Sequence, residues 1–360
     1  NHQALEASPP SPTAEAVDFG LAREDGNRFA LVKATESTQF LDPWYTNHMA
    51  GARAAGLVVG AYHVFDYTID GARQADHFID RLEAVGGLDD ALPPAVDVEC
   101  FIYRGRSSHA IAATRLRDLV ERIYERTGRL PLLYTSAYMW SQVTGNADGF
   151  EDLPLWAACW RCKVPPTLAA GWDDWTFWQI GTFAIPGVTI SPKIRDRIDG
   201  NYFRGKIKDL KAMQLRPFNA GGETGATAGG TVELDLGGRD AVALRTSADG
   251  ETWGPWDRVD GTPTAEIPTQ EGEHEVFVQL RAGPGMRSPV LSDTVVVDST
   301  GPEVVDLGVS LREGPIADDG AVPISVRWQA RDEVAGLSDG SVLVACGEDD
   351  VQRNEAPGSA

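Results

Sequence analysis

The sequence predicts an α/β domain with a parallel sheet or barrel, followed by all-β modules. Residues 29–203 alternate short apolar runs with amphipathic stretches, the pattern of parallel strands joined by helices. Residues 219–230 (NAGGETGATAGG) have the Gly-, Ala- and Thr-rich composition of a linker. The runs that follow are short, β-type and separated by turn signals, which is typical of β-sandwiches.

The N-terminal half contains seven expected strands and three expected helices. Several strand runs are apolar almost throughout, as expected for parallel strands buried on both faces. The strands are expected at residues 29–34, 57–65, 94–99, 130–135, 154–160, 175–180 and 197–203. The helices are expected to begin at Asp42, Asp70 and Ser107-Ser108, and a glycine follows the end of each.

The charge distribution restricts the classes of function. Residues 1–217 contain 23 Lys and Arg against 27 Asp and Glu, whereas residues 218–360 contain 9 against 26. The overall net charge of −21 therefore disfavours binding to nucleic acid phosphates. No apolar stretch approaches the roughly 18 residues of a membrane-spanning helix, so membrane insertion is not expected.

The cysteines indicate a structural disulfide. Cys159 and Cys162 have a spacing that also occurs in redox and zinc sites, but a redox motif opens a helix and a zinc site needs two more ligands. The sequence shows neither context, so we expect a disulfide, with Cys100 as a further candidate partner. We expect no metal and no cofactor.

The segment Ala95-Val96-Asp97-Val98-Glu99 carries the most informative chemistry. Strand alternation places Asp97 and Glu99 on one face, about 6.6 Å apart along the chain. At the C-terminal end of a barrel strand they would face the usual active-site mouth. Repulsion between them would leave one acid protonated beside a carboxylate, as glycoside hydrolysis requires. The alternative is two acids that pair with arginines at a loop.

Other strand ends add polar and aromatic side chains at the same edge of the expected sheet. Aromatic faces pack on the C–H surfaces of sugars, and carboxylates and amides bind hydroxyl groups, so the set suggests a sugar-binding cleft. For the aromatic residues and the histidine, ordinary core packing is the alternative. The candidate substrate-binding residues are Glu36, Tyr62, His63, Phe65, Tyr134, Trp156, Trp178, Gln179 and Asn201, with Asp199 as a further acid.

Residues 29–203 resemble glycoside hydrolase family 25, the N-acetylmuramidase type of lysozyme. The matching segments occur in the family's order with similar spacing, and they cover somewhat over half of the chain. They are Lys33-Ala34-Thr35-Glu36, residues 52–56, residues 60–65, Asp97-Val98-Glu99, Leu133-Tyr134-Thr135, Leu155-Trp156-Ala157, Trp178-Gln179 and residues 199–203.

The resemblance implies a barrel-like (β/α) catalytic domain that cleaves the β-1,4 bond from N-acetylmuramic acid to N-acetylglucosamine in peptidoglycan. Glu99 matches the general acid/base, and Asp97 matches the acid that orients or stabilises the reacting 2-acetamido group. Asp199 matches a further cleft acid, and Tyr62 and Trp178 match substrate contacts.

The sequence departs from the family at its start. The family opens with a strand reading roughly Gly-Ile-Asp-Val-Ser, whose Asp lies in the cleft, whereas Asn1-His2-Gln3 resembles the residues just after that strand. Asp18-Phe19 matches a later segment and does not replace this acid. We therefore expect a barrel without its N-terminal strand, with two open sheet edges and weak activity.

The expected organisation is a catalytic domain, a linker and sandwich modules. The boundaries are residues 1–217 for the catalytic domain, 218–230 for the linker, 231–300 for an immunoglobulin-like or fibronectin-like sandwich and 301–360 for the start of a second, incomplete sandwich. We expect a monomeric extracellular protein that acts on bacterial peptidoglycan, although no signal peptide is visible in the sequence.

Two alternatives accompany the muramidase interpretation. A chitinase-like barrel would carry the motif Asp-x-x-Asp-x-Asp-x-Glu, but Ala95 stands where that motif requires Asp. A non-catalytic protein for cell-wall binding or adhesion, built on a degenerate lysozyme barrel, would explain an incomplete cleft together with sandwich modules.

Overall fold

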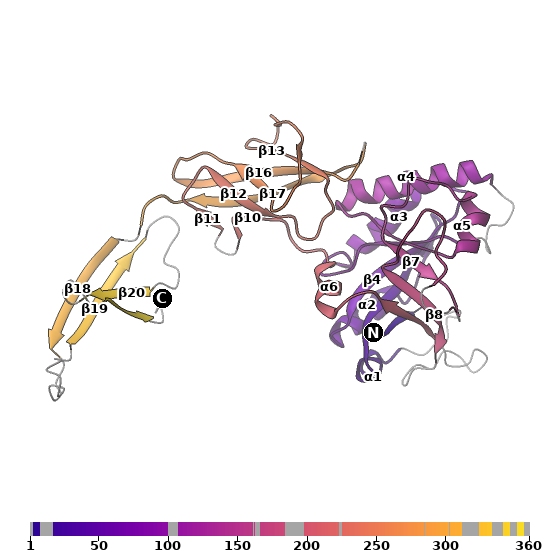
Figure 1. Cartoon of the computed structure of the whole chain (residues 1–360), viewed down its shortest axis with the longest axis horizontal. Helices are drawn as coiled ribbons and strands as arrows, with labels where there is room; N and C mark the ends of the chain where they lie inside the picture. Colours follow the sequence, from indigo (N-terminus) through magenta and orange to yellow (C-terminus); the bar gives the residue numbers. More distant parts are fainter. Residues whose placement is uncertain are drawn as a thin grey trace.

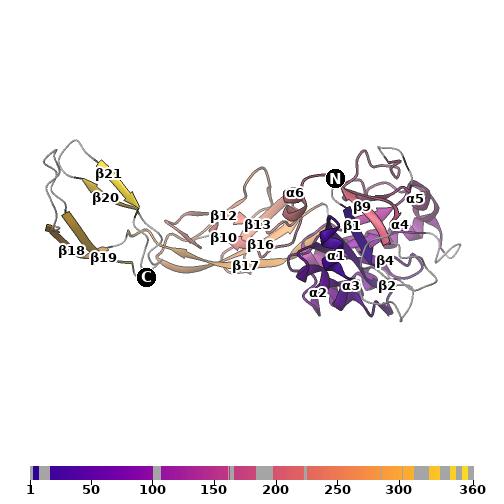
Figure 2. The same cartoon turned by 90° about the horizontal axis from the view of Figure 1, so that it is seen from below.

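The computed structural model has three parts in a row: an α/β barrel, a β-sandwich and a pair of β-hairpins (Figures 1 and 2). The residues that the structure describes are 3–7, 17–99, 107–160, 162, 166–183, 198–222, 225–283, 285–301, 303–311, 324–332, 341–345 and 351–355. Among these residues, no helix combines the length and the apolar character needed to cross a membrane.

The barrel contains eight strands in a closed ring. In ring order they are β1 (Gln3–Ala7), β2 (Asn27–Glu36), β4 (Val58–Val64), β5 (Ala95–Asp97), β6 (Leu132–Thr135), β7 (Leu155–Ala158), β8 (Phe177–Phe183) and β9 (Ile198–Phe203). Neighbours from β1 to β8 are parallel, and β9 is antiparallel to both β8 and β1. The short strand β3 (Phe40–Leu41) folds back on β2. The expected α/β barrel is confirmed.

The expectation of a missing barrel strand with two open edges is wrong. Residues Gln3–Ala7 form β1, in which Leu5 lies opposite Ala30 of β2 and opposite Gly200 of β9. These five residues lack a distinctive strand pattern and precede a Pro- and Ser-rich stretch. Their strand structure depends on two partners that are distant in the sequence, which local patterns do not reveal.

The described part of the barrel domain contains six helices, and three of them were expected. The helices are α1 (Phe19–Glu24), α2 (Tyr45–Ala54), α3 (Gly71–Glu83), α4 (His109–Thr127), α5 (Ala137–Thr144) and α6 (Ile207–Ala212). Asp70 and Ser108 cap α3 and α4 through their side chains, and Gly128 ends α4 with φ of 69°. Asp42 lies before the N-cap of α2, where its Oδ1 accepts a hydrogen bond from the Trp44 backbone at 2.8 Å.

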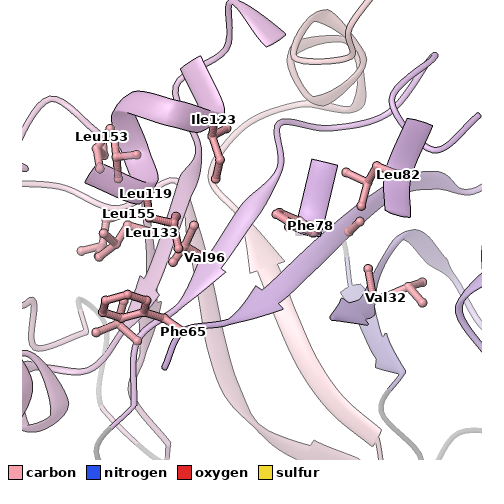
Figure 3. Close-up of a cluster of buried hydrophobic side chains, with 14 of the residues drawn as sticks. Val32, Phe65, Phe78, Leu82, Val96, Leu119, Ile123, Leu133, Leu153 and Leu155 are labelled. Atoms are coloured by element: carbon pink, nitrogen blue, oxygen red, sulfur yellow. The ribbon is translucent and has the colours of Figure 1, made fainter. Parts of the chain in front are cut away.

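Strand alternation separates two apolar layers. One set of side chains fills the barrel interior and includes Phe29, Leu31, Leu132 and Phe177. The other set lies between the strands and the helices, where Phe78 and Leu119 come from α3 and α4 (Figure 3). The two layers therefore determine which strand residues face the barrel axis.

The second part consists of two sheets around one core. One sheet contains β10 (Asn219–Ala220), β12 (Thr231–Asp235) and β15 (Thr264–Glu266). The other contains β11 (Ala226–Thr227), β17 (Arg287–Val297), β16 (Gly272–Arg281), β13 (Ala243–Ser247) and β14 (Asp257–Arg258). Residues 218–230, expected to form a linker, thus contribute two short strands, because β12 and β17 pair with them.

The barrel and the sandwich meet at the C-terminal end of α4. Asp240 accepts hydrogen bonds from the Tyr124 hydroxyl at its carbonyl oxygen and from the Leu130 backbone at its carboxylate, at 2.5 and 2.8 Å. Its carboxylate also lies 3.4 Å from Nε of Arg129, whose guanidinium donates to the Gly238 carbonyl. These contacts fix the sandwich to the barrel.

The third part contains two hairpins. One pairs β18 (Glu303–Leu311) with β19 (Ile324–Arg331), and the other pairs β20 (Ser341–Ala345) with β21 (Val351–Glu355). All side chains of β18 are exposed, in contrast to the alternating burial of β12 and β16.

Candidate active site

Asp97, at the end of β5, and Glu99, two residues further on, face the barrel axis at its C-terminal mouth. Ala95 belongs to the interior layer, whereas Val96 and Val98 belong to the layer under the helices. Asp97 and Glu99 alternate with these valines, so they share the face of Ala95. Asp97 is 7% exposed, and Glu99 lines a pocket at this end of the barrel.

A third acid acts on Glu99 across the barrel. Burial raises the pKa of Glu99, the negative charge of Asp199 raises it further, and the positive charge of Lys33 lowers it. Burial also raises the pKa of Asp199 itself, from 3.8 to about 6. The sequence predicted that repulsion between Asp97 and Glu99 would raise the pKa of one of them; the structure adds Asp199 of β9 as an acid that raises the pKa of Glu99. The site therefore raises the proton affinity of both acids above that of a carboxyl group in water.

Aromatic rings form the floor beneath these acids. Trp156 is fully buried and packs edge-on against Tyr134 and Tyr62, with ring centroids 4.7 and 6.2 Å away. Its indole Nε1 donates to Oδ1 of Asn201 at 2.7 Å. The structure thus brings these four predicted residues together around the barrel axis. Trp156 and Asn201 are buried there, and Trp156 packs against both tyrosines.

The pocket beside Glu99 has a volume of about 480 Å³. Tyr134, Tyr138, Met139 and Trp160 are among its lining residues. Tyr138 and Trp160 are 57% and 55% exposed and belong to the segments that follow β6 and β7. Sequence reasoning missed both residues, although an aromatic residue just beyond a barrel strand is a usable signal, because βα loops form the mouth.

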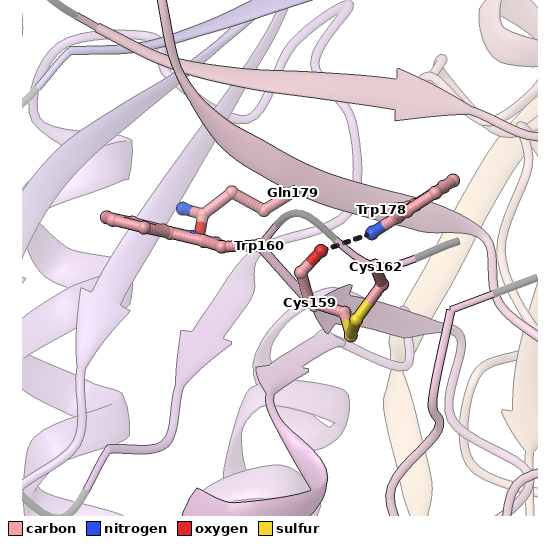
Figure 4. Close-up of a disulfide and its surroundings, with 5 residues drawn as sticks. All are labelled: Cys159, Trp160, Cys162, Trp178 and Gln179. Atoms are coloured by element: carbon pink, nitrogen blue, oxygen red, sulfur yellow. Dashed lines mark hydrogen bonds between the residues drawn. A yellow bond between two sulfur atoms is a disulfide. The ribbon is translucent and has the colours of Figure 1, made fainter. Parts of the chain in front are cut away.

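Gln179 connects two walls of this pocket. It is 1% exposed, and its Oε1 accepts hydrogen bonds from the Tyr134 hydroxyl at 2.9 Å and from Nε1 of Trp160 at 2.5 Å. A disulfide joins Cys159 to Cys162 on either side of the segment that carries Trp160 (Figure 4). Cys100 and Cys346 lie outside the described residues.

Three candidate substrate-binding residues lie outside the cleft. His63 is fully buried behind the barrel wall, where its ring nitrogens lie 2.8 Å from Oγ1 of Thr35 and 3.2 Å from Oε1 of Gln74. Phe65 belongs to the layer under the helices. Trp178 alternates with Gln179 and donates from Nε1 to the Cys159 carbonyl at 3.0 Å. The structure thus places these three side chains away from the residues that line the pocket beside Glu99, and their substrate-binding roles remain predictions.

Glu36 lies at the end of β2 and forms an ion pair with Lys33 at 2.7 Å. Since the Lys33 charge lowers the pKa of Glu99, this pair borders the acid site. A larger hollow of about 690 Å³ lies at the opposite end of the barrel, lined by Pro154, Thr176 and Phe203 among others. None of the predicted site residues is among the residues that line it.

A closed α/β barrel with acids of raised pKa in an aromatic cleft at its mouth defines the class of the glycoside hydrolases. Residues 11–185 match the family model described as "Glycosyl hydrolases family 25". The chain is 31% identical over 211 residues to an N,O-diacetylmuramidase from Chalaropsis sp, covering 55% of this chain and 93% of the relative. It is 30% identical over 205 residues to Lysozyme M1 from Streptomyces globisporus, covering 55% of this chain and 67% of the relative.

Solved structures show the same likeness. A bacterial lysozyme from Streptomyces coelicolor is 29% identical with a TM-score of 0.52, and the match covers 59% of this chain and 96% of that chain. A muramidase from Trichobolus zukalii is 30% identical with a TM-score of 0.50, and the match covers 59% of this chain and 99% of that chain. The chain belongs to glycosyl hydrolase family 25, as its sequence motifs predict.

Proposed function

We propose that this protein is an N-acetylmuramidase that hydrolyses the β-1,4 bond from N-acetylmuramic acid to N-acetylglucosamine in bacterial peptidoglycan. The observation that carries the proposal is the raised pKa of Glu99, which stands at the pocket and is influenced by Asp199. The muramidase and lysozyme names of the relatives support the same reaction class.

Glu99 acts as the general acid and then as the general base. In its protonated form it donates a proton to the glycosidic oxygen while the bond from that oxygen to the sugar's anomeric carbon breaks. The resulting carboxylate later accepts a proton from the water that completes hydrolysis. A raised pKa suits both steps, because it keeps the proton on Glu99 to a higher pH and makes the carboxylate a stronger base.

Asp97 orients the 2-acetamido group of the reacting sugar and stabilises the positive charge that develops on it. This substrate-assisted route differs from the common scheme in which one of two carboxylates attacks the sugar. Asp199 adjusts the proton affinity of Glu99 through its charge. Tyr62 and Tyr134, which share the floor with Trp156, provide apolar surface for the sugar rings.

Replacement of Glu99 by Gln tests this proposal, because the amide keeps the shape of the side chain but cannot supply the proton. Turnover of purified peptidoglycan should fall by about 10²- to 10⁴-fold, the usual contribution of a general acid or base. Glu151→Gln, at the opposite end of the barrel, is the matched control and should retain activity. If Glu99→Gln keeps most of the wild-type turnover, the proposed role of Glu99 is wrong.

We also propose that residues 231–300 act as a spacer or targeting module of a monomeric extracellular protein. The net charge of −17 over residues 218–360 should repel walls rich in teichoic acid, so targeting would require shape or a protein partner. A pull-down of the full Glu99→Gln chain and of a variant shortened after residue 217 on purified peptidoglycan compares their binding at low and high salt. Extra binding by the full chain that disappears with added salt would contradict the charge argument.

A further inference from the structure

Trp160 presents an aromatic face to the pocket that contains Glu99. Its side chain is 55% exposed although it is large and apolar, and it lines the same pocket as Tyr134 and Tyr138. Contact between an indole ring and water is unfavourable, but an exposed indole offers a flat surface on which a pyranose ring can pack. Its position beside the acid suggests a sugar subsite next to the bond that is cleaved.

The residue before Trp160 is anchored to β8 by its backbone. The Cys159 N–H donates to the Gln179 carbonyl at 3.1 Å, and the Cys159 carbonyl accepts from Nε1 of Trp178 at 3.0 Å. Trp160 itself is held through its side chain, by the bond from Nε1 to Oε1 of Gln179. Figure 4 shows Trp160 and Gln179 next to each other, with the disulfide close to Trp178.

The disulfide restricts the turn that carries Trp160. The Cα atoms of Cys159 and Cys162 are 5.6 Å apart. A fully extended segment of three residues would span about 10 Å. The cross-link therefore excludes extended backbone conformations of the segment that carries Trp160, and the hydrogen bond to Gln179 holds its ring.

We propose that the Cys159–Cys162 disulfide is a positioning element that holds Trp160 as a wall against which a substrate pyranose ring packs in the subsite beside Glu99. This inference rests on the proposed muramidase function. Glu99 lies two residues beyond β5, outside the cross-linked segment. Burial and the charge of Asp199 raise its pKa and the charge of Lys33 lowers it, and neither charged residue belongs to the segment that the disulfide closes. The disulfide therefore affects binding of the sugar chain and leaves the chemical step nearly unchanged.

Sugar binding in a Glu99→Gln background separates this role from catalysis. The probe is a soluble peptidoglycan tetrasaccharide with two N-acetylglucosamine–N-acetylmuramic acid repeats, and the Kd is measured by calorimetry. Trp160→Ala and the double variant Cys159→Ser/Cys162→Ser should each raise Kd about tenfold, which is equivalent to about 1.4 kcal/mol. A triple variant that carries all three substitutions should bind the tetrasaccharide no more weakly than Trp160→Ala alone. Trp328→Ala, which removes a 40% exposed tryptophan from β19, should leave Kd unchanged.

Reversible reduction gives a second readout. A dithiol reagent transfers two electrons and two protons to the disulfide, which yields the thiols of Cys159 and Cys162 and the oxidised reagent. This treatment should raise Kd to the value of the double serine variant, removal of the reagent and reoxidation should restore it, and the serine variant should not respond. In the active chain, KM should rise while kcat stays within about twofold.

Each outcome decides one point. An unchanged Kd in the double serine variant would overturn the positioning role of the disulfide, and an unchanged Kd in Trp160→Ala would overturn the wall. If the Glu99→Gln chain with its disulfide intact does not bind the tetrasaccharide, there is no such subsite. Failure of the wild-type chain to cleave peptidoglycan would refute the proposed function instead, and the binding comparison still tests the wall.

Discussion

Asp199 is held in an environment that costs stability at neutral pH. Burial raises its pKa from 3.8 to about 6, so the folded protein binds this proton more tightly than the unfolded chain does. The stability linked to this proton is fully present below pH 3.8 and is lost as the pH rises through 6. At about 1.4 kcal/mol per pKa unit the loss is at most about 3 kcal/mol, and we expect about 2 kcal/mol because the side chain is partly exposed.

The substitution Asp199→Asn removes this ionisation and keeps the shape of the side chain. The variant should exceed the wild type in free energy of unfolding by about 2 kcal/mol at pH 7.5, and by no more than about 0.5 kcal/mol at pH 4. Urea unfolding at several pH values, followed by tryptophan fluorescence, measures the difference. Asp173→Asn, at an exposed acid, is the control for the change in net charge. A gain that is equal at both pH values, or larger at pH 4, would refute this view of Asp199.

The same substitution should change the pH dependence of catalysis. The Asp199 charge raises the pKa of Glu99, so its removal lowers that pKa. Because the general acid must be protonated in the free enzyme, the alkaline limb of kcat/KM should move to lower pH in Asp199→Asn. An alkaline limb that stays in place would show that Asp199 does not control the proton on Glu99.

Three further substitutions and one double variant test contacts other than the Glu99–Asp199 pair. Asp240→Ala removes the carboxylate partner of Arg129, whose side chain is 5% exposed, and should lower the free energy of unfolding by about 3 kcal/mol. Arg129→Met leaves the 40% exposed side chain of Asp240 in contact with water and should lower it by about 1 kcal/mol. The double variant should cost less than the sum, and calorimetric unfolding that gives the opposite order would contradict the burial argument. Trp156→Phe removes the donor to the buried Asn201 oxygen and should cost about 1–3 kcal/mol in urea unfolding; a loss below about 0.5 kcal/mol would contradict that contact.

Local patterns were sufficient to predict the face of β5 and the starts of α3 and α4, the helices before and after it in the chain. The period of two along Ala95 to Glu99 places both acids on the axis, and the structure has the alternating valines in the outer layer. The caps at Asp70 and Ser108 lie where the sequence predicts them, because a cap is decided by a few neighbouring residues. These features depend on short-range chemistry.

The remaining features depend on contacts between distant residues. Tyr62 and His63 were both assigned to the cleft, but adjacent strand residues point to opposite faces, and only the packing of α3 shows that His63 is the outward one. The influence of Asp199 on Glu99 requires β9 to close the ring through β1, which the sequence pattern did not indicate. Trp160 lies in a loop, where no periodicity predicts the direction of its ring.

The reducing ends released from peptidoglycan test the central claim most directly. Purified peptidoglycan is digested with the full chain, reduced with borohydride and hydrolysed, and the reduced amino sugars are identified by mass spectrometry. The proposed muramidase reaction predicts new reduced muramic acid that is absent after digestion with Glu99→Gln. New reduced glucosamine, or no increase in reducing ends with the wild-type chain, would contradict it.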